Sequence, residues 1–268
     1  MDKTIEEKLA GSLTAETTDL LPYLPYLLQD FWELGSDPTV MVELIEKHIT
    51  TSENTTVLDL ACGKGAVSVA VAEKLRVKVK GVDLISEFID FAVQKANQHG
   101  VADLCSFEVG DINAVVETAR GYDVVIMGAA GDALGSPAET LQKLKQTVKA
   151  GGYIMIDEAY LKDGGSQEDV AYNNYEYLTG TQWLKLFEES GLELAETFSV
   201  SEDESGSMDS DTEMVAITQR ANELIEKHPD KKAMFEGYIR SQQSEYSDLD
   251  NQLVGVVWML RKKGSLAE

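Results

Sequence analysis

The sequence predicts an α/β fold in which helices cover both faces of a doubly wound parallel sheet. Short apolar runs, rich in Val and Ile, recur at residues 55–60, 77–82, 104–109, 122–128 and 152–157. Segments with apolar residues at helical spacing separate these runs, and each such stripe predicts a helix that packs on the sheet. Strands that are apolar on both faces, each followed by a helix, are typical of a parallel sheet. Ligands of such sheets bind beyond the carboxyl ends of the strands.

The composition bounds the size of the domain and the class of partner. The chain has 268 residues, 43% of them hydrophobic, which is enough for one large α/β domain with additions. Its net charge of −24 argues against nucleic acid as a partner. Cys62 and Cys105 have no metal-ligand spacing, so no metal site is expected. The sequence has no leader pattern and no apolar run of membrane-spanning length, so we expect a soluble, cytoplasmic protein without a membrane partner.

Residues 1–50 are predicted to form a helical N-terminal cap. Pro22 and Pro25 interrupt an aromatic and leucine-rich patch, after which Ser36-Asp37-Pro38 has the pattern of a helix start. Aromatic residues in such a patch pack more often than they bind ligands. The other interpretation is a lid, because the patch directly precedes the first predicted strand.

The end of the chain is predicted to contain two strands with a helical insertion between them. A helix at about 181–190 is followed by a strand at about 192–200, and the last strand lies at 253–260. An acidic stretch and two helices, broken at His228-Pro229, separate these strands. The predicted domains are a cap at 1–50, an α/β core at 51–200 and 252–268, and an insertion at 201–251 that is a lid or an interface.

Four sets of acidic or small residues follow successive predicted strands. Asp59 ends the first strand, before a loop in which Gly63 and Gly65 let the backbone approach a ligand. Asp83 ends the second strand, where an acid can accept hydrogen bonds from both hydroxyls of a ribose. Gly110-Asp111-Ile112 and Gly128-Ala129-Ala130-Gly131 end the third and fourth strands. Each set alone is weak evidence, but four in order predict a nucleoside site.

The glycine pattern decides between two kinds of nucleoside ligand. A dinucleotide-binding loop requires a third glycine three residues after Gly65, and the residue there is Ser68. Asp59 would repel a pyrophosphate and would suit an ammonium group. A ligand that combines adenine, ribose and an amino-acid end without phosphate is S-adenosylmethionine. A nucleotide oxidoreductase is therefore disfavoured.

Over residues 55–200 and the last strand, the sequence resembles the class I S-adenosylmethionine-dependent methyltransferase family. The resembling motifs are VLDLACGKG (57–65), VKGVDLI (79–85), FEVGDIN (107–113), YDVVIMGAAG (122–131) and AGGYIMIDE (150–158). The resemblance implies a Rossmann-like methyltransferase fold: a doubly wound, mostly parallel seven-stranded sheet in which only the last strand is antiparallel. A helical cap would precede this sheet, and a helical insertion would precede its last strand.

The resemblance also implies a role for each matching residue. Asp59, Ala61, Gly63 and Gly65 would line the methionine end, Asp83 with Leu84 would hold the ribose, Gly110, Asp111 and Ile112 would hold the adenine, and Gly128 and Ala129 would lie near the sulfonium. The family's loop commonly begins with Gly where this chain has Ala61. Alanine should be tolerated there if the φ of Ala61 is negative.

The acceptor is less well defined by the sequence. The candidates for its site, each of which packing would also explain, are Tyr23, Trp32, Glu158, Tyr160, Tyr172 and Tyr175. No catalytic base is named. The fourth strand lacks the (D/N)PP(Y/F) motif of resembling enzymes that methylate amino groups of nucleic acids or glutamine, and the chain has no Pro-Cys nucleophile.

The leading hypothesis is a methyltransferase that forms S-adenosylhomocysteine and acts on a small-molecule acceptor by in-line displacement. The alternative is a non-catalytic S-adenosylmethionine-binding or regulatory module. The sequence leaves open the acceptor, the methylated atom and the oligomeric state, for which a homodimer is one option.

Overall fold

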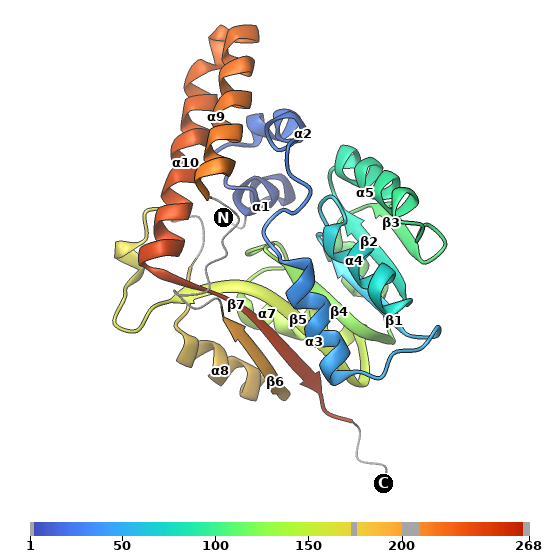
Figure 1. Ribbon diagram of the computed structural model, residues 1–268. Coiled ribbons are helices and arrows are strands. Elements are labelled where there is room, and N and C mark those ends of the chain that lie inside the picture. The colour runs from blue at the N-terminus through green and yellow to red at the C-terminus, as the bar shows by residue number, and fades with distance from the viewer. Residues whose placement is uncertain (1–2, 173–175, 200–209, 265–268) are drawn as a thin grey trace. The chain divides into compact units, whose positions relative to one another are not determined.

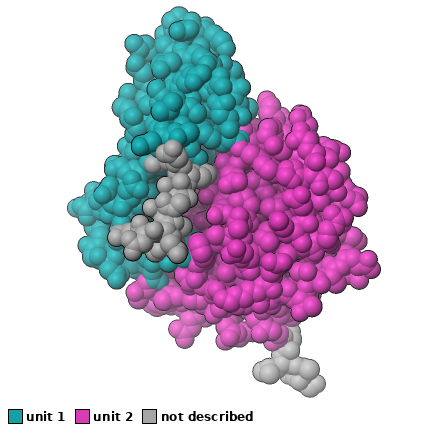
Figure 2. All heavy atoms as spheres, viewed as in Figure 1, with its two compact units in different colours: residues 1–31, 159–180, 199–256 teal, residues 32–158, 181–198, 257–268 magenta. Residues whose placement is uncertain are grey.

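The computed structural model describes residues 3–172, 176–199 and 210–264. The chain forms two compact units, drawn in separate colours in Figure 2. Unit 1 comprises residues 1–31, 159–180 and 199–256, and unit 2 comprises residues 32–158, 181–198 and 257–268. Each unit is therefore built from segments that are distant in the sequence.

The strands form one seven-stranded sheet with the order β3-β2-β1-β4-β5-β7-β6 (Figure 1). The strands are β1 Thr56–Leu60, β2 Lys78–Asp83, β3 Cys105–Val109, β4 Tyr122–Gly128, β5 Val148–Leu161, β6 Leu192–Ser199 and β7 Leu253–Lys262. The pairs β1–β2, β1–β4, β2–β3 and β4–β5 are parallel. Because the strand order reverses at β1, the carboxyl ends of β1 and β4 form the switch point at which such sheets bind ligands. The predicted doubly wound sheet is confirmed.

In unit 2, helices alternate with the strands and supply the apolar faces that cover the sheet. These helices are α3 Pro38–His48, α4 Ala66–Leu75, α5 Ser86–Gln98, α6 Ile112–Thr118, α7 Pro137–Thr147 and, from its second residue, α8 Gly180–Glu189. Their main apolar cluster combines Met41 and Ile45 of α3 with Val69 of α4 and Val57 and Val124 of the sheet. All five side chains are buried, as expected for a sheet that is covered on both faces.

Two helices of unit 2 begin at well-formed N-caps, and the predicted start at Ser36-Asp37-Pro38 is confirmed. Asp37 is the N-cap of α3 and accepts from the backbone N–H groups of Thr39 and Val40. Ser136 is the N-cap of α7, with Pro137 in the first turn and a reciprocal capping box with Glu139. These signals act within a few residues, which is why the sequence shows them.

Unit 1 contains α1 Ile5–Ser12, α2 Leu24–Leu27, α9 Ser210–Lys227 and α10 Lys232–Asn251. The predicted break at His228-Pro229 is confirmed, because α9 ends at Lys227 and a short 3-10 turn precedes α10. Leu24 and Leu27 of α2 share one buried apolar cluster with Ala221 and Leu224 of α9 and with Phe235 of α10. The inserted helices therefore have a core because they share it with the N-terminal segment.

The domain boundaries of the structure differ from the predicted ones. The predicted cap, residues 1–50, is divided after Phe31. Residues 32–50 belong to unit 2, because α3 packs its apolar face into the cluster that covers the sheet. Residues 1–31 share unit 1 with the predicted insertion, residues 201–251.

The part of the chain that the structure describes offers no candidate for a membrane-spanning helix or for a metal site. None of the helices in residues 3–172, 176–199 and 210–264 is long and apolar enough to span a bilayer. Within the same ranges, no three His, Cys, Asp or Glu side chains are grouped so that they could hold a metal ion.

Candidate functional site

The loop after β1 brings bare backbone to the switch point of the sheet. It is held in place by two backbone hydrogen bonds, from Cys62 N to Val82 O at 3.0 Å and from Gly65 N to Cys62 O at 2.9 Å. Gly65 is the left-handed N-cap of α4, with φ +75°, and a Cβ on it would lie 2.7 Å from Ala92 Cβ. Glycine is therefore required at this position for both conformation and space.

The condition under which alanine was expected to be tolerated at residue 61, a negative φ, is not met. Ala61 has φ +58°, and Ala129, at the end of β4, has φ +49°. An L-residue other than glycine costs roughly 1–2 kcal/mol in this region, because its Cβ approaches the following carbonyl oxygen. Both strained residues lie in turns predicted to contact the ligand, and strain of this kind is concentrated at functional sites.

Asp59 lies at the base of the loop with its side chain only 3% exposed. Ser68 Oγ donates a hydrogen bond to Asp59 Oδ2 at 2.6 Å. Ser68, whose presence disfavoured a dinucleotide, thus has a direct role in positioning the acid. Burial raises the pKa of Asp59 to about 7, although the Ser68 hydroxyl opposes this rise. A cation beside Asp59 would favour its ionised form, so the residue suits an ammonium group.

Asp83 organises the loop through its carboxylate. Its Oδ2 accepts from Gly63 N and its Oδ1 from Ile85 N, both at 2.9 Å. Burial raises the pKa of Asp83, and these backbone N–H groups oppose the rise. The N–H of Leu84 also opposes the rise, and because a carboxylate offers about four acceptor positions, these bonds leave capacity for a ribose hydroxyl.

The turns after β3 and β4 complete the edge of the site. Gly110 N donates to Asp83 O at 2.9 Å, which joins the ends of β2 and β3. Asp111 is the N-cap of α6 and accepts from Asn113 N at 2.8 Å, while Ile112 is buried. Ala129 N donates to Asp157 O at 3.0 Å, which joins the ends of β4 and β5. The four predicted sets, with half-buried Leu84 after Asp83, therefore follow four neighbouring strands at one edge. Their roles in binding stay predictions.

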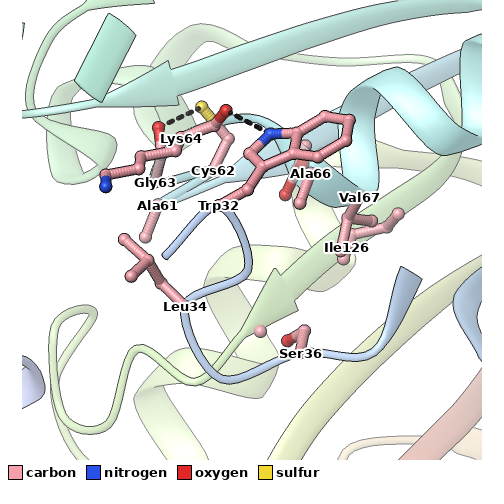
Figure 3. A pocket seen from close by; sticks show the side chains of 12 residues that line it. Trp32, Leu34, Ser36, Ala61, Cys62, Gly63, Lys64, Ala66, Val67 and Ile126 are labelled. Atoms are coloured by element: carbon pink, nitrogen blue, oxygen red, sulfur yellow. Dashed lines mark hydrogen bonds between the residues drawn. The ribbon is translucent and has the colours of Figure 1, made fainter. Parts of the chain in front are cut away.

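A small cavity lies against the loop, and a segment before α3 forms one of its walls (Figure 3). We call residues 32–37 the strap. The cavity has a volume of about 40 Å³, and its walls include Trp32, Leu34, Ser36, Asp59, Gly63 and Gly128. Trp32 Nε1 donates to Lys64 O at 3.0 Å, as Figure 3 shows. Lys95 Nζ lies 4.4 Å from the centre of the Trp32 ring, in a cation–π contact that also holds the strap.

The acceptor-side candidates that the structure describes are divided between the two units. Trp32 and Glu158 belong to unit 2, whereas Tyr23, Tyr160 and Tyr172 belong to unit 1. Tyr175 lies outside the described residues.

Three of these candidates have packing roles in the structure. The Tyr23 ring lies 5.1 Å from the Phe235 ring, and its hydroxyl contacts Lys231 Nζ at 3.0 Å. Tyr172 is buried and donates to Gly11 O at 2.8 Å. Trp32 packs on the loop after β1, as described above, and forms part of the cavity wall.

Ser36 was missed as a candidate. In the sequence it was interpreted only as part of a helix start, because it precedes the N-cap Asp37. The structure places it on the wall of the cavity, opposite residues more than twenty positions later in the chain. No local sequence signal could have revealed that contact.

Comparisons with known proteins agree with this geometry. A family model described as "Methyltransferase domain" matches residues 51–205, more than half of the chain. A ribosomal protein L11 methyltransferase of Exiguobacterium sp. is 31% identical over 102 residues, which cover 37% of this chain and 31% of that protein. A ubiquinone biosynthesis O-methyltransferase of Leptothrix cholodnii is 29% identical over 112 residues, which cover 42% of this chain and 47% of that protein.

A solved structure shares the fold over almost its whole length. It is a SAM-dependent methyltransferase of Geobacter sulfurreducens in complex with S-adenosyl-L-homocysteine, with a TM-score of 0.73 and 22% identity. The match covers 90% of this chain and 98% of that one. The two curated relatives above are matched over less than half of their own length. On the family model and the fold together, the chain belongs to the methyltransferase-domain family, in the class I S-adenosylmethionine-dependent group.

Proposed function

We propose that the protein transfers the methyl group of S-adenosylmethionine to a small-molecule acceptor. The observation that carries this proposal is the end of β4, where the turn Gly128-Ala129-Ala130-Gly131 has only small residues and Gly128 lines the cavity. An enzyme that orients an exocyclic amino group of a base would need polar groups at that turn. The net charge of −24 also disfavours a polyanionic acceptor.

The names of the two relatives point to different classes of acceptor, first a protein and second a small molecule. The Exiguobacterium protein is named for a ribosomal protein and the Leptothrix protein for ubiquinone biosynthesis. The small side chains after β4 favour the second class for this chain. We therefore propose the small molecule over the protein.

The buried groups around the cavity fit the cofactor that the family uses. The cavity wall includes the buried carboxyl group of Asp59 and the buried hydroxyl of Ser36, and the glycine backbone of Gly63 and Gly128 leaves room for a ligand. Asp59 would pair with the ammonium of the cofactor and Asp83 with its ribose. The cofactor supplies an activated methyl group, which leaves a neutral thioether when it is transferred.

The contribution of the chain to the reaction is chiefly to position the two reactants. An ordered loop, held by Asp83 through Gly63 N, fixes the cofactor end of the reaction axis. Holding two reactants in line is worth several kcal/mol of the barrier. A base is needed only for an acceptor that carries its proton at neutral pH, and no residue is assigned that role.

Labelled methyl transfer tests the proposal. The protein is incubated with S-adenosylmethionine labelled in its methyl group and with a cell extract, and the products are separated by ultrafiltration into small molecules and macromolecules. We expect enzyme-dependent label among the small molecules. Label found only in protein or nucleic acid would contradict a small-molecule acceptor.

The same experiment separates the proposed function from the non-catalytic alternative. A binding or regulatory module would bind S-adenosylhomocysteine in calorimetry and still give no labelled product with extracts or with a broad panel of acceptors. The matched control is Gly63→Val, in which the bulky side chain would block the loop. A signal that persists in this variant would come from a contaminating enzyme.

A further inference from the structure

The strap touches the ends of two strands of unit 2 at close range. A Cβ on Gly128 would lie 2.2 Å from Ser36 Oγ, and a Cβ on Gly63 would lie 3.3 Å from Leu34 Cδ1. A Cβ on Gly35 would lie 2.6 Å from Ala129 Cβ. The absence of side chains at these three glycines therefore allows the strap to pass directly over the predicted ligand turns. Figure 3 shows Leu34 and Ser36 facing the cavity from this segment.

Ser36 has a buried hydroxyl with no hydrogen bond. The residue is 8% exposed, and Ser36 Oγ has no partner of acceptable geometry. It lies near Asp157, whose pKa burial raises to about 6 and the Ser36 hydroxyl lowers in turn. An unsatisfied buried polar group costs about 1–3 kcal/mol, and native structures contain few of them. Such a group on a cavity wall suggests a ligand that completes its bonding.

We propose that Ser36 binds the amino-acid end of the cofactor through its hydroxyl group. The cavity of about 40 Å³ has room for about three water molecules, so it fits a charged end group and not a nucleoside. Its walls include Asp59, for an ammonium group, and Ser36, which can donate to a carboxylate or accept from an ammonium. The adenosine end is expected at Asp83 and Asp111, on the turns after β2 and β3. The inference rests on this proposed placement of the cofactor and is independent of the acceptor.

A purely structural role for Ser36 is the competing explanation. A small rotation would let the hydroxyl donate to Asp157, and the pair would then only fasten the strap to the end of β5. In that case removal of the hydroxyl would change stability and would affect every ligand of the loop alike. The two explanations differ in whether the effect depends on the amino-acid end of the ligand.

Calorimetry with two ligands separates these explanations. S-adenosylhomocysteine carries the amino-acid end, and 5′-methylthioadenosine has the same adenosine and sulfur without it. Both are titrated into the wild-type chain, into Ser36→Ala, and into Ser190→Ala. Ser190 is a matched control, because it is a buried serine of unit 2 that is not part of the cavity wall. Thermal unfolding is recorded for each variant.

The proposal predicts a selective loss. Ser36→Ala should weaken S-adenosylhomocysteine about tenfold or more and leave 5′-methylthioadenosine within about twofold, as expected for one hydrogen bond to a charged group. Ser190→Ala should change neither affinity. Equal weakening of both ligands, or unchanged binding of S-adenosylhomocysteine by Ser36→Ala, would overturn the assignment. If the wild-type chain binds no S-adenosylhomocysteine, the cofactor site and this inference both fail, whatever the acceptor is.

Discussion

Unit 2 is built around ladders of parallel strands, whereas side chains join the N-terminal segment of unit 1 to its inserted helices. In unit 2, β1 pairs with β2 on one side and with β4 on the other. In unit 1, side chains of α9 reach Tyr26 in α2 and Asp30 just after it, about two hundred positions earlier. The difference decides what a single substitution can do, because a ladder survives the loss of one side chain and a side-chain contact does not.

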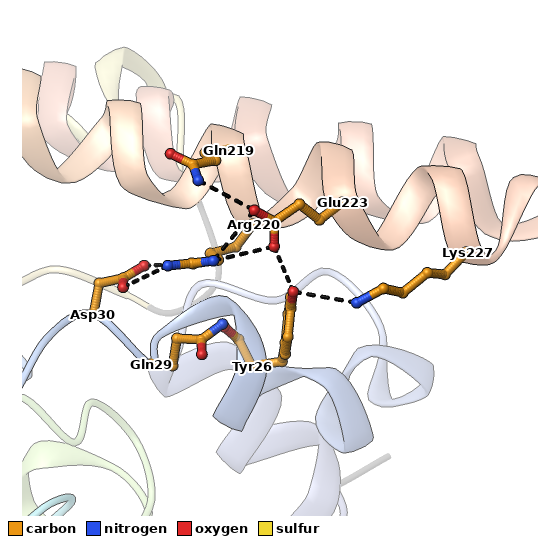
Figure 4. A network of polar contacts seen from close by, with 7 residues as sticks. All are labelled: Tyr26, Gln29, Asp30, Gln219, Arg220, Glu223 and Lys227. Atoms are coloured by element: carbon orange, nitrogen blue, oxygen red, sulfur yellow. Dashed lines mark hydrogen bonds and ion pairs between the residues drawn. The ribbon is translucent and has the colours of Figure 1, made fainter.

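The polar network of unit 1 is centred on Arg220 (Figure 4). Its guanidinium makes two parallel bonds to Asp30, from Nε at 2.7 Å and from Nη2 at 2.8 Å. Nη1 donates to Glu223, whose carboxylate also accepts from the hydroxyl of Tyr26. Lys227 Nζ lies 4.6 Å from the centre of the Tyr26 ring. These contacts hold the N-terminal segment against α9.

A second set of contacts ties the middle segment of unit 1 to α10. Asp248 is buried and accepts from Ala171 N at 3.0 Å and from Tyr172 N at 2.6 Å. Tyr172 in turn donates to Gly11 O, so three distant segments meet. Unit 1 is thus assembled by aromatic and charged side chains around a small apolar core, and its fold should be the more sensitive of the two to side-chain removal.

The largest effect on stability is expected from Phe235→Ala. Phe235 is fully buried at the centre of the apolar cluster of unit 1. Its truncation should lower the free energy of unfolding by about 3–5 kcal/mol, measured by urea denaturation. Leu249→Ala, at a 39% exposed position of the same helix, is the matched control and should have little effect.

Phe235→Ala also tests the separation of the units. All the predicted cofactor residues belong to unit 2, so the folded variant should keep its affinity for S-adenosylhomocysteine. A parallel loss of affinity under conditions in which the variant is fully folded would break the comparison.

The largest effect on binding is expected from Gly63→Val. Gly63 has φ +52°, and its missing Cβ faces the strap, so a branched side chain would both strain the loop and fill the cavity. S-adenosylhomocysteine binding should fall more than about a hundredfold in calorimetry, a loss of roughly 2.7 kcal/mol. Gly121→Val is the matched control. Gly121 also has a positive φ, +82°, but the space around it is open, so valine there causes backbone strain without blocking a cavity. Equal losses in both variants would assign the effect to strain alone.

A moderate, pH-dependent effect is expected at Asp59. Because its pKa is about 7, the carboxyl group is mostly neutral below that pH and ionised above it. The ammonium of the ligand stays protonated over this range, so affinity for S-adenosylhomocysteine should fall as the pH is lowered from about 8 to about 6. Asp59→Asn, which cannot ionise, should bind weakly at every pH in that range. An unchanged slope in the variant would show that another group titrates.

For folding alone, the sign at Asp59 is the opposite. Its raised pKa means that the folded chain favours the protonated form, so this group's contribution to stability is present at low pH and is lost as the pH rises toward about 7. Bound ligand should reduce that loss. Thermal unfolding with and without S-adenosylhomocysteine, recorded between about pH 4 and about pH 8, measures both effects.

The smallest effect is expected from Arg220→Ala. It removes the bonds to Asp30 and Glu223, but these groups are partly open to water, where ion pairs are screened. The midpoint of thermal unfolding should fall by less than in Phe235→Ala, and the difference from wild type should shrink in high salt. A fall as large as that of Phe235→Ala would mean that the polar network, and not the apolar cluster, holds unit 1 together.

The sequence could predict the features that are determined by residues close together in the chain. The strands, the helix start at Ser36-Asp37-Pro38 and the helix break at His228-Pro229 depend on neighbouring residues, so periodicity and cap signals predicted them. The strand-end sets that belong to the candidate site were visible for the same reason, because each of them directly follows a strand.

The remaining features depend on contacts between distant segments. The strap crosses Gly128, and neither partner carries a local signal of the other. Ala61 has a positive φ, against the preference of alanine itself, because it lies in the turn that brings Cys62 N within hydrogen-bond distance of Val82 O. The division of the chain after Phe31 likewise reflects which core each helix joins, and periodicity shows only that a helix has an apolar face.

A crystal structure with S-adenosylhomocysteine tests the central claim most directly. We expect the ribose hydroxyls to bond to Asp83 and the adenine to lie beside Asp111 and Ile112. We expect the sulfur to lie toward Gly128 and Ala129, with the amino-acid end between Asp59 and Ser36. Electron density for the ligand away from the loop after β1, or a ribose without contact to Asp83, would contradict it.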